Sequence, residues 1–189
     1  PELSLADAFP DRFRMDRSGI EEDGRTFVCI HNPPLRLAII GAVHIALYLA
    51  PMARACGYTP VIIDPRSAFA AQERFPDETL IDAWPDTALE SLDMDARMAV
   101  VTLSHDPKLD DPAIIAALGS KVFYLGCLGS KRTHAKRLDR LRDAGFGDDD
   151  LARINGPVGL DLGGRQPAEI AISIMAQITQ TLRKPSRTV

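Results

Sequence analysis

Short apolar runs alternate with longer segments of mixed polarity through most of the chain. The run MAVVTL at 98–103 is apolar at nearly every position, and RLAII at 36–40 is similar. Strands of this kind belong to sheets that are covered on both faces, where all side chains are buried. Strands are predicted at 36–40, 59–64, 98–104 and 121–125, with a weaker one at 79–82.

The segments between these strands have helical periodicity and helix-start signals. Helices are predicted at 43–56, 66–75, 112–118, 130–144 and 167–182. Strands that alternate with helices of this length are joined by right-handed crossovers into a parallel sheet. The predicted fold is therefore α/β, a doubly wound and mostly parallel sheet of order 3-2-1-4-5 with helices on both faces.

The length of the chain, 189 residues, suits one such domain rather than two. We assign this domain to residues 35–189. Residues 1–34 are rich in Asp, Glu, Arg and Pro, and only TFVCIH at 26–31 has the pattern of a strand. We expect residues 1–34 to form an N-terminal extension that contributes one strand at an edge of the sheet and ends near Pro34.

Charge and cysteine content narrow the class of protein. The formal net charge of −4 gives nonspecific nucleic-acid binding no electrostatic support. Cys29, Cys56 and Cys127 have no metal-site spacing, and an odd, scattered set indicates a reducing compartment rather than a disulfide framework. No run approaches the roughly 18 apolar residues of a membrane helix, and the first residues lack a signal-peptide pattern. The expected location is cytoplasmic.

Ligands of doubly wound sheets bind beyond the carboxyl ends of the strands, where the winding reverses. For the predicted order, this crevice lies between the first and fourth strands. The segments that should contribute to it follow Ile40, Leu103 and Leu125.

The first of these segments looks like a nucleotide-binding turn that has lost one glycine. Gly41 permits a tight turn, but Val43 stands where the usual Gly-x-Gly-x-x-Gly pattern has its second glycine. Asp64, at the end of the second strand, has the spacing of an acid that holds a ribose hydroxyl. Dinucleotide binding, a purely structural crossover and a modified ligand pose are all open.

The side chain of Val43 should block a pyrophosphate, because its methyl groups fill the space that a glycine leaves free. A β-branched residue also resists positive φ, so we expect an ordinary helix start here, with His44 facing the ligand from the side. On this interpretation, Val43→Gly should make binding of NAD(P) or AMP measurable.

The second segment, Ser104-His105-Asp106, places three polar residues at the rim of the crevice. Ser104 or Asp106 could cap the next helix and leave His105 in solvent. Alternatively, His44 and His105 overhang one crevice as proton donors, metal ligands or phosphate partners. A metal site needs at least a third ligand, which no spacing in the chain supplies, so no metal ligand is assigned.

The third segment, YLGCLGSKRTHAKR at 124–137, combines a turn with a helix start. Gly126 and Gly129 allow an unusual turn. Cys127 is either a thiol of low pKa beside a helix start or, as is commoner, a small buried residue.

Ser130 is a good N-cap for the helix that follows. Lys131, Arg132 and His134 then fall in its first turn, where cations are disfavoured unless an anion compensates. We therefore predict a phosphate or acidic-ligand site at 126–132. Most of the cations further along this helix are interpreted as its solvated face.

The last feature is a glycine-dense loop at 155–166 (NGPVGLDLGGRQ), which carries Asp161 and Arg165. Because each glycine costs chain entropy, such a loop indicates close backbone packing or a fold over the ligand crevice. The helix after it is apolar on nearly every side. We expect this helix to be buried in the fold or in a dimer, and the chain to work as a homodimer or with a partner chain.

Five stretches, in this order, resemble the XdhC/CoxI family, the accessory proteins of xanthine dehydrogenase and related molybdenum hydroxylases. They are RLAIIGAVHIA, VIIDPR, LSHDPKLD, YLGCLGSKRTHAKRL and INGPVGLDLGGRQPAEIAISIMAQI, and they cover about residues 35–182. The matching part of the family is its C-terminal, Rossmann-like domain. The resemblance implies a non-catalytic chaperone that binds the molybdenum cofactor, molybdopterin. It would help deliver the cofactor, in sulfurated form, to an apo-hydroxylase of the xanthine dehydrogenase or CO dehydrogenase type.

On this interpretation the segments described above hold the cofactor, and no residue is assigned to catalysis or to a metal. The predicted cofactor-binding residues are Gly41, Val43, His44, Asp64, Ser104, His105, Asp106, Gly126, Cys127, Gly129, Ser130, Lys131, Arg132, Asp161 and Arg165.

The chain departs from the family pattern in two respects. Family members typically have glycine at the position of Val43 and alanine at that of Cys127. They also carry a separate N-terminal domain with a Gly-Gly-Cys motif, which residues 1–34 lack. Either a separate chain supplies the N-terminal domain, or this chain carries out only part of the delivery of the cofactor. A cysteine desulfurase is a further expected partner.

Two other functions are open. An NAD(P)-dependent oxidoreductase would need a catalytic acid or base, for which His105 with Asp106 is the candidate pair, and a substrate domain, for which little chain is left. A regulatory scaffold with a vestigial nucleotide crevice would agree with Val43.

Overall fold

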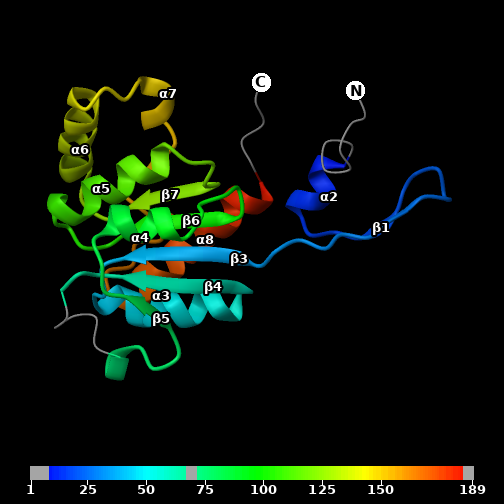
Figure 1. The fold of residues 1–189 in the computed structure, drawn as a ribbon, viewed down its shortest axis with the longest axis horizontal. Helices are drawn as coiled ribbons and strands as arrows, with labels where there is room; N and C mark the ends of the chain where they lie inside the picture. The colour runs from blue at the N-terminus through cyan, green and yellow to red at the C-terminus, as the bar shows by residue number, and fades with distance from the viewer. Residues whose placement is uncertain (1–8, 67–71, 185–189) are drawn as a thin grey trace.

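The computed structural model describes residues 9–66 and 72–184. Its centre is a six-stranded sheet in which each pair of neighbouring strands is parallel (Figure 1). The strands, in their order across the sheet, are β5 (Thr79–Ile81), β4 (Tyr58–Ile63), β3 (Leu35–Ile40), β6 (Met98–Thr102), β7 (Tyr124–Cys127) and β8 (Ile154–Asn155). The predicted order 3-2-1-4-5 is confirmed for the first five. β8 adds a sixth strand, whose two residues are too few to produce a sequence pattern.

Helices cover both faces of the sheet, as predicted. One face is covered by α3 (His44–Ala55) and α8 (Pro167–Arg183). The core on the other face includes α4 (Pro85–Ser91), α5 (Pro107–Leu118), α6 (Lys131–Asp143) and α7 (Asp148–Leu151). No helix within the described ranges has both the length and the apolar character needed to cross a membrane.

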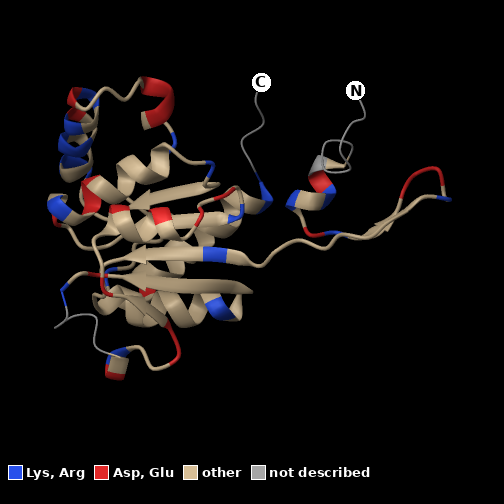
Figure 2. Cartoon of the chain, viewed as in Figure 1, with Lys and Arg blue, Asp and Glu red and all other residues tan. Residues whose placement is uncertain are grey.

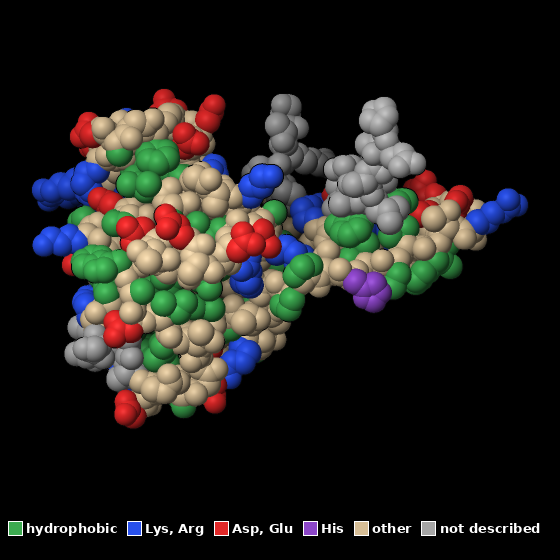
Figure 3. Space-filling view, in the orientation of Figure 1, with side chains coloured by type: hydrophobic (Ala, Val, Ile, Leu, Met, Phe, Trp, Pro, Cys, Tyr) green, Lys and Arg blue, Asp and Glu red, His purple; other side chains and the backbone are tan. Residues whose placement is uncertain are grey.

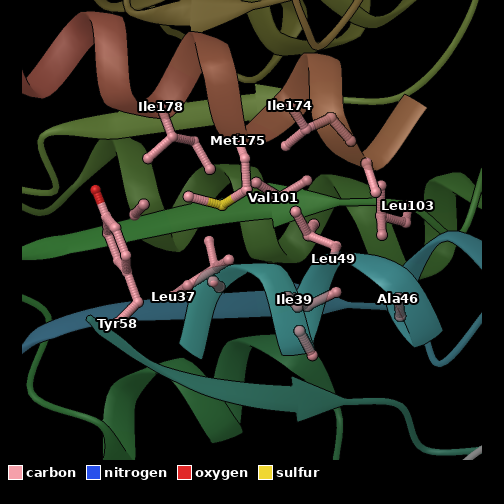
Figure 4. Packing of buried hydrophobic residues seen from close by; sticks show 14 of the residues in the cluster. Leu37, Ile39, Ala46, Leu49, Tyr58, Val101, Leu103, Ile174, Met175 and Ile178 are labelled. Carbon is pink, nitrogen blue, oxygen red and sulfur yellow. The ribbon is translucent and has the colours of Figure 1, made fainter. Parts of the chain in front are cut away.

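The strands are apolar throughout because successive side chains enter different cores. Leu37 of β3 packs in the layer with α3 and α8, whereas its neighbour Ala38 packs in the opposite layer. Figure 4 shows the first layer, whose side chains include Leu49 of α3 and Ile174 of α8. The prediction that α8 is buried within the fold is confirmed, except that Ile172 is 50% exposed. A homodimer stays a prediction.

Several helical regions differ from the sequence-based expectation, and α4 and α7 were not predicted at all. α5 begins at Pro107 instead of residue 112, because Asp106 caps it by accepting a hydrogen bond from the backbone amide of Lys108 at 3.0 Å. Half of the helix predicted at 66–75, residues 67–71, lies outside the described residues, and its last part is the 3-10 turn η1 (Gln72–Arg74).

The N-terminal extension forms its own small unit beside the domain (Figure 1). It contains a short helix, α2 (Pro10–Arg14), and the antiparallel strands β1 (Gly19–Ile20) and β2 (Phe27–Val28). The expectation of an edge strand is wrong, because β2 pairs with β1 and not with the six-stranded sheet. Ion pairing between Asp16 and Arg97 at 3.0 Å helps to hold the extension against the domain.

Candidate functional site

The turn after β3 is closed against the turn after β6. Gly41 has a φ of +104°, and a side chain there would lie 3.1 Å from the backbone nitrogen of Ser104. Glycine is therefore required both for the conformation and for the close approach. The tight turn predicted at Gly41 is present, but its close packing against Ser104 leaves little room between β3 and β6.

Val43 is the N-cap residue of α3, with φ −89° and ψ 177°. This extended conformation suits a β-branched residue, so the ordinary helix start that we expected is confirmed. Val43 packs against the core of the α3–α8 face, and His44, the first helical residue, is exposed.

Asp64 stabilises this turn from inside the protein. Its buried carboxylate accepts hydrogen bonds from the backbone amide of Ala42 at 2.9 Å and from the guanidinium of Arg66 at 2.8 and 2.7 Å. Burial alone would raise the pKa of Asp64, but the hydrogen bonds from Arg66 and Ala42 together hold it below its ordinary value. Asp64 is therefore not placed to hold a ribose hydroxyl as we expected, because the hydroxyl would have to displace Arg66 to reach it.

The turn after β6 uses two of its three polar residues to start α5. The Ser104 hydroxyl donates to Asp110 Oδ1 at 2.6 Å and accepts from the amide of Asp106 at 3.1 Å. Asp106 is the N-cap described above, so the capping interpretation is confirmed. His105 is exposed, with a φ of +62°. Within the described ranges, no group of three or more His, Cys, Asp or Glu side chains is arranged to hold a metal ion.

Two residues predicted in the turn after β7 belong to the strand itself. Gly126 lies within β7, where any side chain would overlap Val158, so it serves close packing and not a turn. Cys127 ends β7, is fully buried, and its pKa is raised to about 12 by burial. The interpretation of Cys127 as a small buried residue is confirmed, and its assignment to cofactor binding is wrong, because the side chain lies in the core. The turn is formed by Gly129, with a φ of +145°.

The first turn of α6 is capped as predicted, but its cations are separated. Ser130 Oγ accepts a hydrogen bond from the amide of Thr133 at 3.1 Å. Lys131 and Arg132 line two different cavities. His134 is half-buried, and mainly this burial lowers its pKa, so it is neutral near pH 7 and not the third cation that we expected.

The first of these cavities, the glycine-loop cavity, lies between residues 157–165, the start of α6 and the first turn of α8. Its volume is about 520 Å³. Lys131, Arg165 and Asp161 supply charges to its wall, and Leu128 and Ile170 supply apolar surface. The predicted residues Lys131, Asp161 and Arg165 are thus brought together.

The glycine-dense loop is held in place by α8 and β7. The side-chain carbonyl of Gln177 accepts hydrogen bonds from the amide of Gly159 at 2.7 Å and from the hydroxyl of Tyr124 at 2.6 Å. A side chain at Gly159, whose φ is +93°, would overlap Ser173. The predicted close backbone packing is confirmed, and the loop is a preformed wall. Gln177 was not predicted from the sequence, although an amide among the apolar residues of this helix was a signal.

The second cavity, the α5–α6 cavity, has a volume of about 290 Å³. His105 and Asp110 line it from α5 and the turn before it. The α6 side chains are Arg132, Thr133, Lys136, Arg137 and Arg140. The interpretation of the later cations as a solvated face is corrected at Arg137, which is 2% exposed.

The comparisons with known proteins agree with this architecture. Residues 37–178 match the family model described as the XdhC Rossmann domain. The chain belongs to the XdhC family. It is 33% identical over 147 residues to the molybdenum cofactor insertion chaperone PaoD of Escherichia coli, covering 78% of this chain and 40% of PaoD. It is 31% identical over 154 residues to a probable xanthine dehydrogenase subunit of Bacillus subtilis, covering 81% of this chain and 44% of that protein.

Among solved structures, a protein described as a xanthine dehydrogenase from Bacillus halodurans has a TM-score of 0.69 and 30% identity. The match covers 82% of this chain and 45% of that one. The chain therefore spans less than half the length of the relatives it matches. The comparisons thus show the family and the fold of this chain.

Proposed function

We propose that this member of the XdhC family binds the molybdenum cofactor in the glycine-loop cavity and transfers it to an apo-hydroxylase of the xanthine dehydrogenase or CO dehydrogenase type. The name of the related PaoD, a molybdenum cofactor insertion chaperone, supports this assignment. The chain acts as a carrier and contributes no catalytic residue of its own.

The observation that carries the proposal is the preformed, mixed lining of the glycine-loop cavity. A volume of about 520 Å³ falls within the roughly 300–1,000 Å³ of small-molecule sites. A phosphorylated pterin combines a flat ring, which suits the apolar residues Leu128 and Ile170, with polar edges that suit exposed loop amides. Its phosphate would be attracted by Lys131 and Arg165.

The charged side chains that line this cavity balance one another, so its attraction for a phosphate depends on direct contacts with its two cations. Glu169 lies at the rim, but one of its oxygens accepts hydrogen bonds from the amides of Arg165 and Gln166 at 2.8 and 2.9 Å. This carboxylate therefore caps α8. It keeps its negative charge and offsets the positive end of the α8 dipole, so Lys131 and Arg165 are matched by two acids, Asp161 and Glu169.

The oxidoreductase alternative has less support. Asp64, the expected ribose ligand, is engaged by Arg66. Asp106, the expected partner of a catalytic His105, is engaged as the cap of α5. Neither acid is free for the role that a dinucleotide enzyme would need.

Sulfuration of the cofactor is assigned to a partner, either a cysteine desulfurase or a separate chain that supplies the N-terminal domain. No cysteine in residues 9–66 and 72–184 lines the glycine-loop cavity. Cys127 is buried, and the exposed Cys56 follows the end of α3, near the start of β4 and so at the amino edge of the sheet.

The test is retention of cofactor released from a molybdenum hydroxylase, measured as pterin fluorescence after gel filtration. We expect about one equivalent on the native chain and about tenfold weaker binding in Lys131→Ala and Arg165→Ala, since each removes a charge-assisted contact. Lys121→Ala is the control, because this exposed lysine precedes β7 at the other edge of the sheet. Equal retention by all four proteins, or none by the native chain, would contradict the proposal.

A further inference from the structure

The α5–α6 cavity has a stronger positive charge than the glycine-loop cavity. Four cations line it from one face of α6, namely Arg132, Lys136, Arg137 and Arg140. Figure 2 shows that α6 is predominantly basic, and in Figure 3 Lys and Arg side chains project at the left edge of the molecule, where Figure 1 places α6. The two cavities share no lining residue.

Arg137 is the buried member of this set. Its Nη2 donates to the carbonyl of Leu128 at 2.9 Å and lies 3.7 Å from Asp110 Oδ2. Its Nε and Nη1 are buried and have no hydrogen-bond partner in the described part of the chain. Leaving the donors of a buried guanidinium unsatisfied is costly. A ligand with acceptor oxygens in the cavity would remove this cost.

Asp110 compensates Arg137 only in part. It is as deeply buried as Arg137, and its other oxygen is already occupied by the hydroxyl of Ser104. Burial raises the pKa of Asp110, which reflects the poor solvation of a negative charge at this position.

The remaining cations of the cavity differ in whether they are free to contact a ligand. Arg140 is fixed by two hydrogen bonds to Asp111, at 2.6 and 2.8 Å, so its charge is neutralised. Arg132 and Lys136 are exposed and have no ion-pair partner within residues 9–66 and 72–184. Two exposed cations thus line the same cavity as one buried guanidinium whose hydrogen-bond donors are only partly satisfied.

We propose that the α5–α6 cavity binds the phosphoryl group of a small phosphorylated molecule, held by Arg132, Lys136 and Arg137. Arginine and lysine are the residues that recognise phosphate oxygens, and a guanidinium can do so with two parallel hydrogen bonds. The volume of about 290 Å³ suits a phosphate with a short substituent. The cations converge on a cavity in a chain of net charge −4, which favours a small ligand over a nucleic-acid backbone. This proposal does not rest on the cofactor proposal.

The experiment is calorimetric titration of the full chain with inorganic phosphate and with glycerol phosphate at constant ionic strength. We expect one saturable site and about tenfold weaker binding in Arg132→Ala and in Lys136→Ala. Arg142→Ala is the matched control, because Arg142 is an exposed cation of the same helix that pairs with Asp139 and Asp148 outside the cavity. Its affinity should stay within twofold of that of the native chain.

Absence of saturable binding, or equal affinity in the native chain and Arg132→Ala, would overturn the proposal. The ester should bind at least as tightly as inorganic phosphate, and weaker binding of the ester would overturn the assignment to a phosphorylated molecule. Arg137→Met is expected to abolish binding, and Asp110→Asn to strengthen it about threefold by removing the nearby negative charge. If Arg137→Met does not fold, the double variant with Asp110→Asn removes both buried charges, and the same loss of binding is expected.

Discussion

Lys131 and Arg132 are neighbours in the chain, yet they line cavities on different sides of α6. Successive residues of a helix point about 100° apart, so the first turn of α6 can present one cation to the glycine loop and the next to α5. The sequence predicts one anion site here, whereas the structure places its two cations in separate cavities.

This separation predicts that the two side chains act independently. Lys131→Ala should weaken retention of the cofactor about tenfold and leave phosphate affinity within twofold, and Arg132→Ala should do the reverse. Both are exposed, so the free energy of unfolding should change by less than about 0.5 kcal/mol. Parallel loss of both ligands in each variant would mean that a single ligand spans the two cavities.

The thiol of Cys127 should not react with alkylating reagents in the folded protein. Burial raises the pKa of its thiol to about 12, whereas Cys29 and Cys56 are exposed. Iodoacetamide at pH 8 should therefore label Cys29 and Cys56 and reach Cys127 only after denaturation, as followed by peptide mass spectrometry. Cys127→Ala should retain cofactor normally. Labelling of Cys127 at the rate of Cys56 would show that the strand end opens to solvent.

The first βα turn should resist conversion into a nucleotide site. From the sequence alone, Val43→Gly is expected to make NAD(P) binding measurable, but the ion pair of Asp64 with Arg66 is a second obstacle. We now expect calorimetry to detect NAD(P) binding in the double variant Val43→Gly/Arg66→Ala and not in Val43→Gly. Low-micromolar binding by the native chain would contradict this account and favour the oxidoreductase.

Asp64 should make stability depend on pH in the acid range. Its pKa in the folded protein lies below the ordinary value of 3.8, so its contribution is complete above that value and is lost as the pH falls through the folded pKa. Asp64→Asn should lower the free energy of unfolding by about 2 kcal/mol at pH 7, allowing for the partly exposed Arg66. Urea unfolding at pH 7 and pH 3 should show the two proteins converging at the lower pH. If the two proteins differed in free energy of unfolding by the same amount at pH 7 and pH 3, the ion pair of Asp64 would not be the source of the stabilisation.

Most of the sheet could be predicted because its signals are local. Apolar runs mark β3, β4, β6 and β7, and the doubly wound arrangement that alternating strands and helices favour then gives their order. β8 was missed because two residues carry no pattern. The start of α5 was misplaced because Pro107 and Pro112 both resemble a first helical residue, and the choice depends on the cap at Asp106.

The sites were harder to predict because they depend on tertiary contacts. Arg137 follows the spacing of a solvated face, and only the packing of α6 beside α5 buries it. Asp64 has the spacing of a ribose ligand, but the guanidinium two residues later engages it first. The glycine-dense loop was recognised from composition, whereas its anchor Gln177 lies on a helix whose pattern is almost uniformly apolar.

The central claim is that the cofactor occupies the glycine-loop cavity, and hydrogen–deuterium exchange tests it most directly. The native chain would be compared with and without cofactor released from a molybdenum hydroxylase, with exchange resolved by overlapping peptides. The account predicts slower exchange of the backbone amides at 161–164, and little change at 41–44 and 104–106. Protection of 41–44 and 104–106 without protection of 161–164 would place the ligand at the first βα turn and contradict the claim.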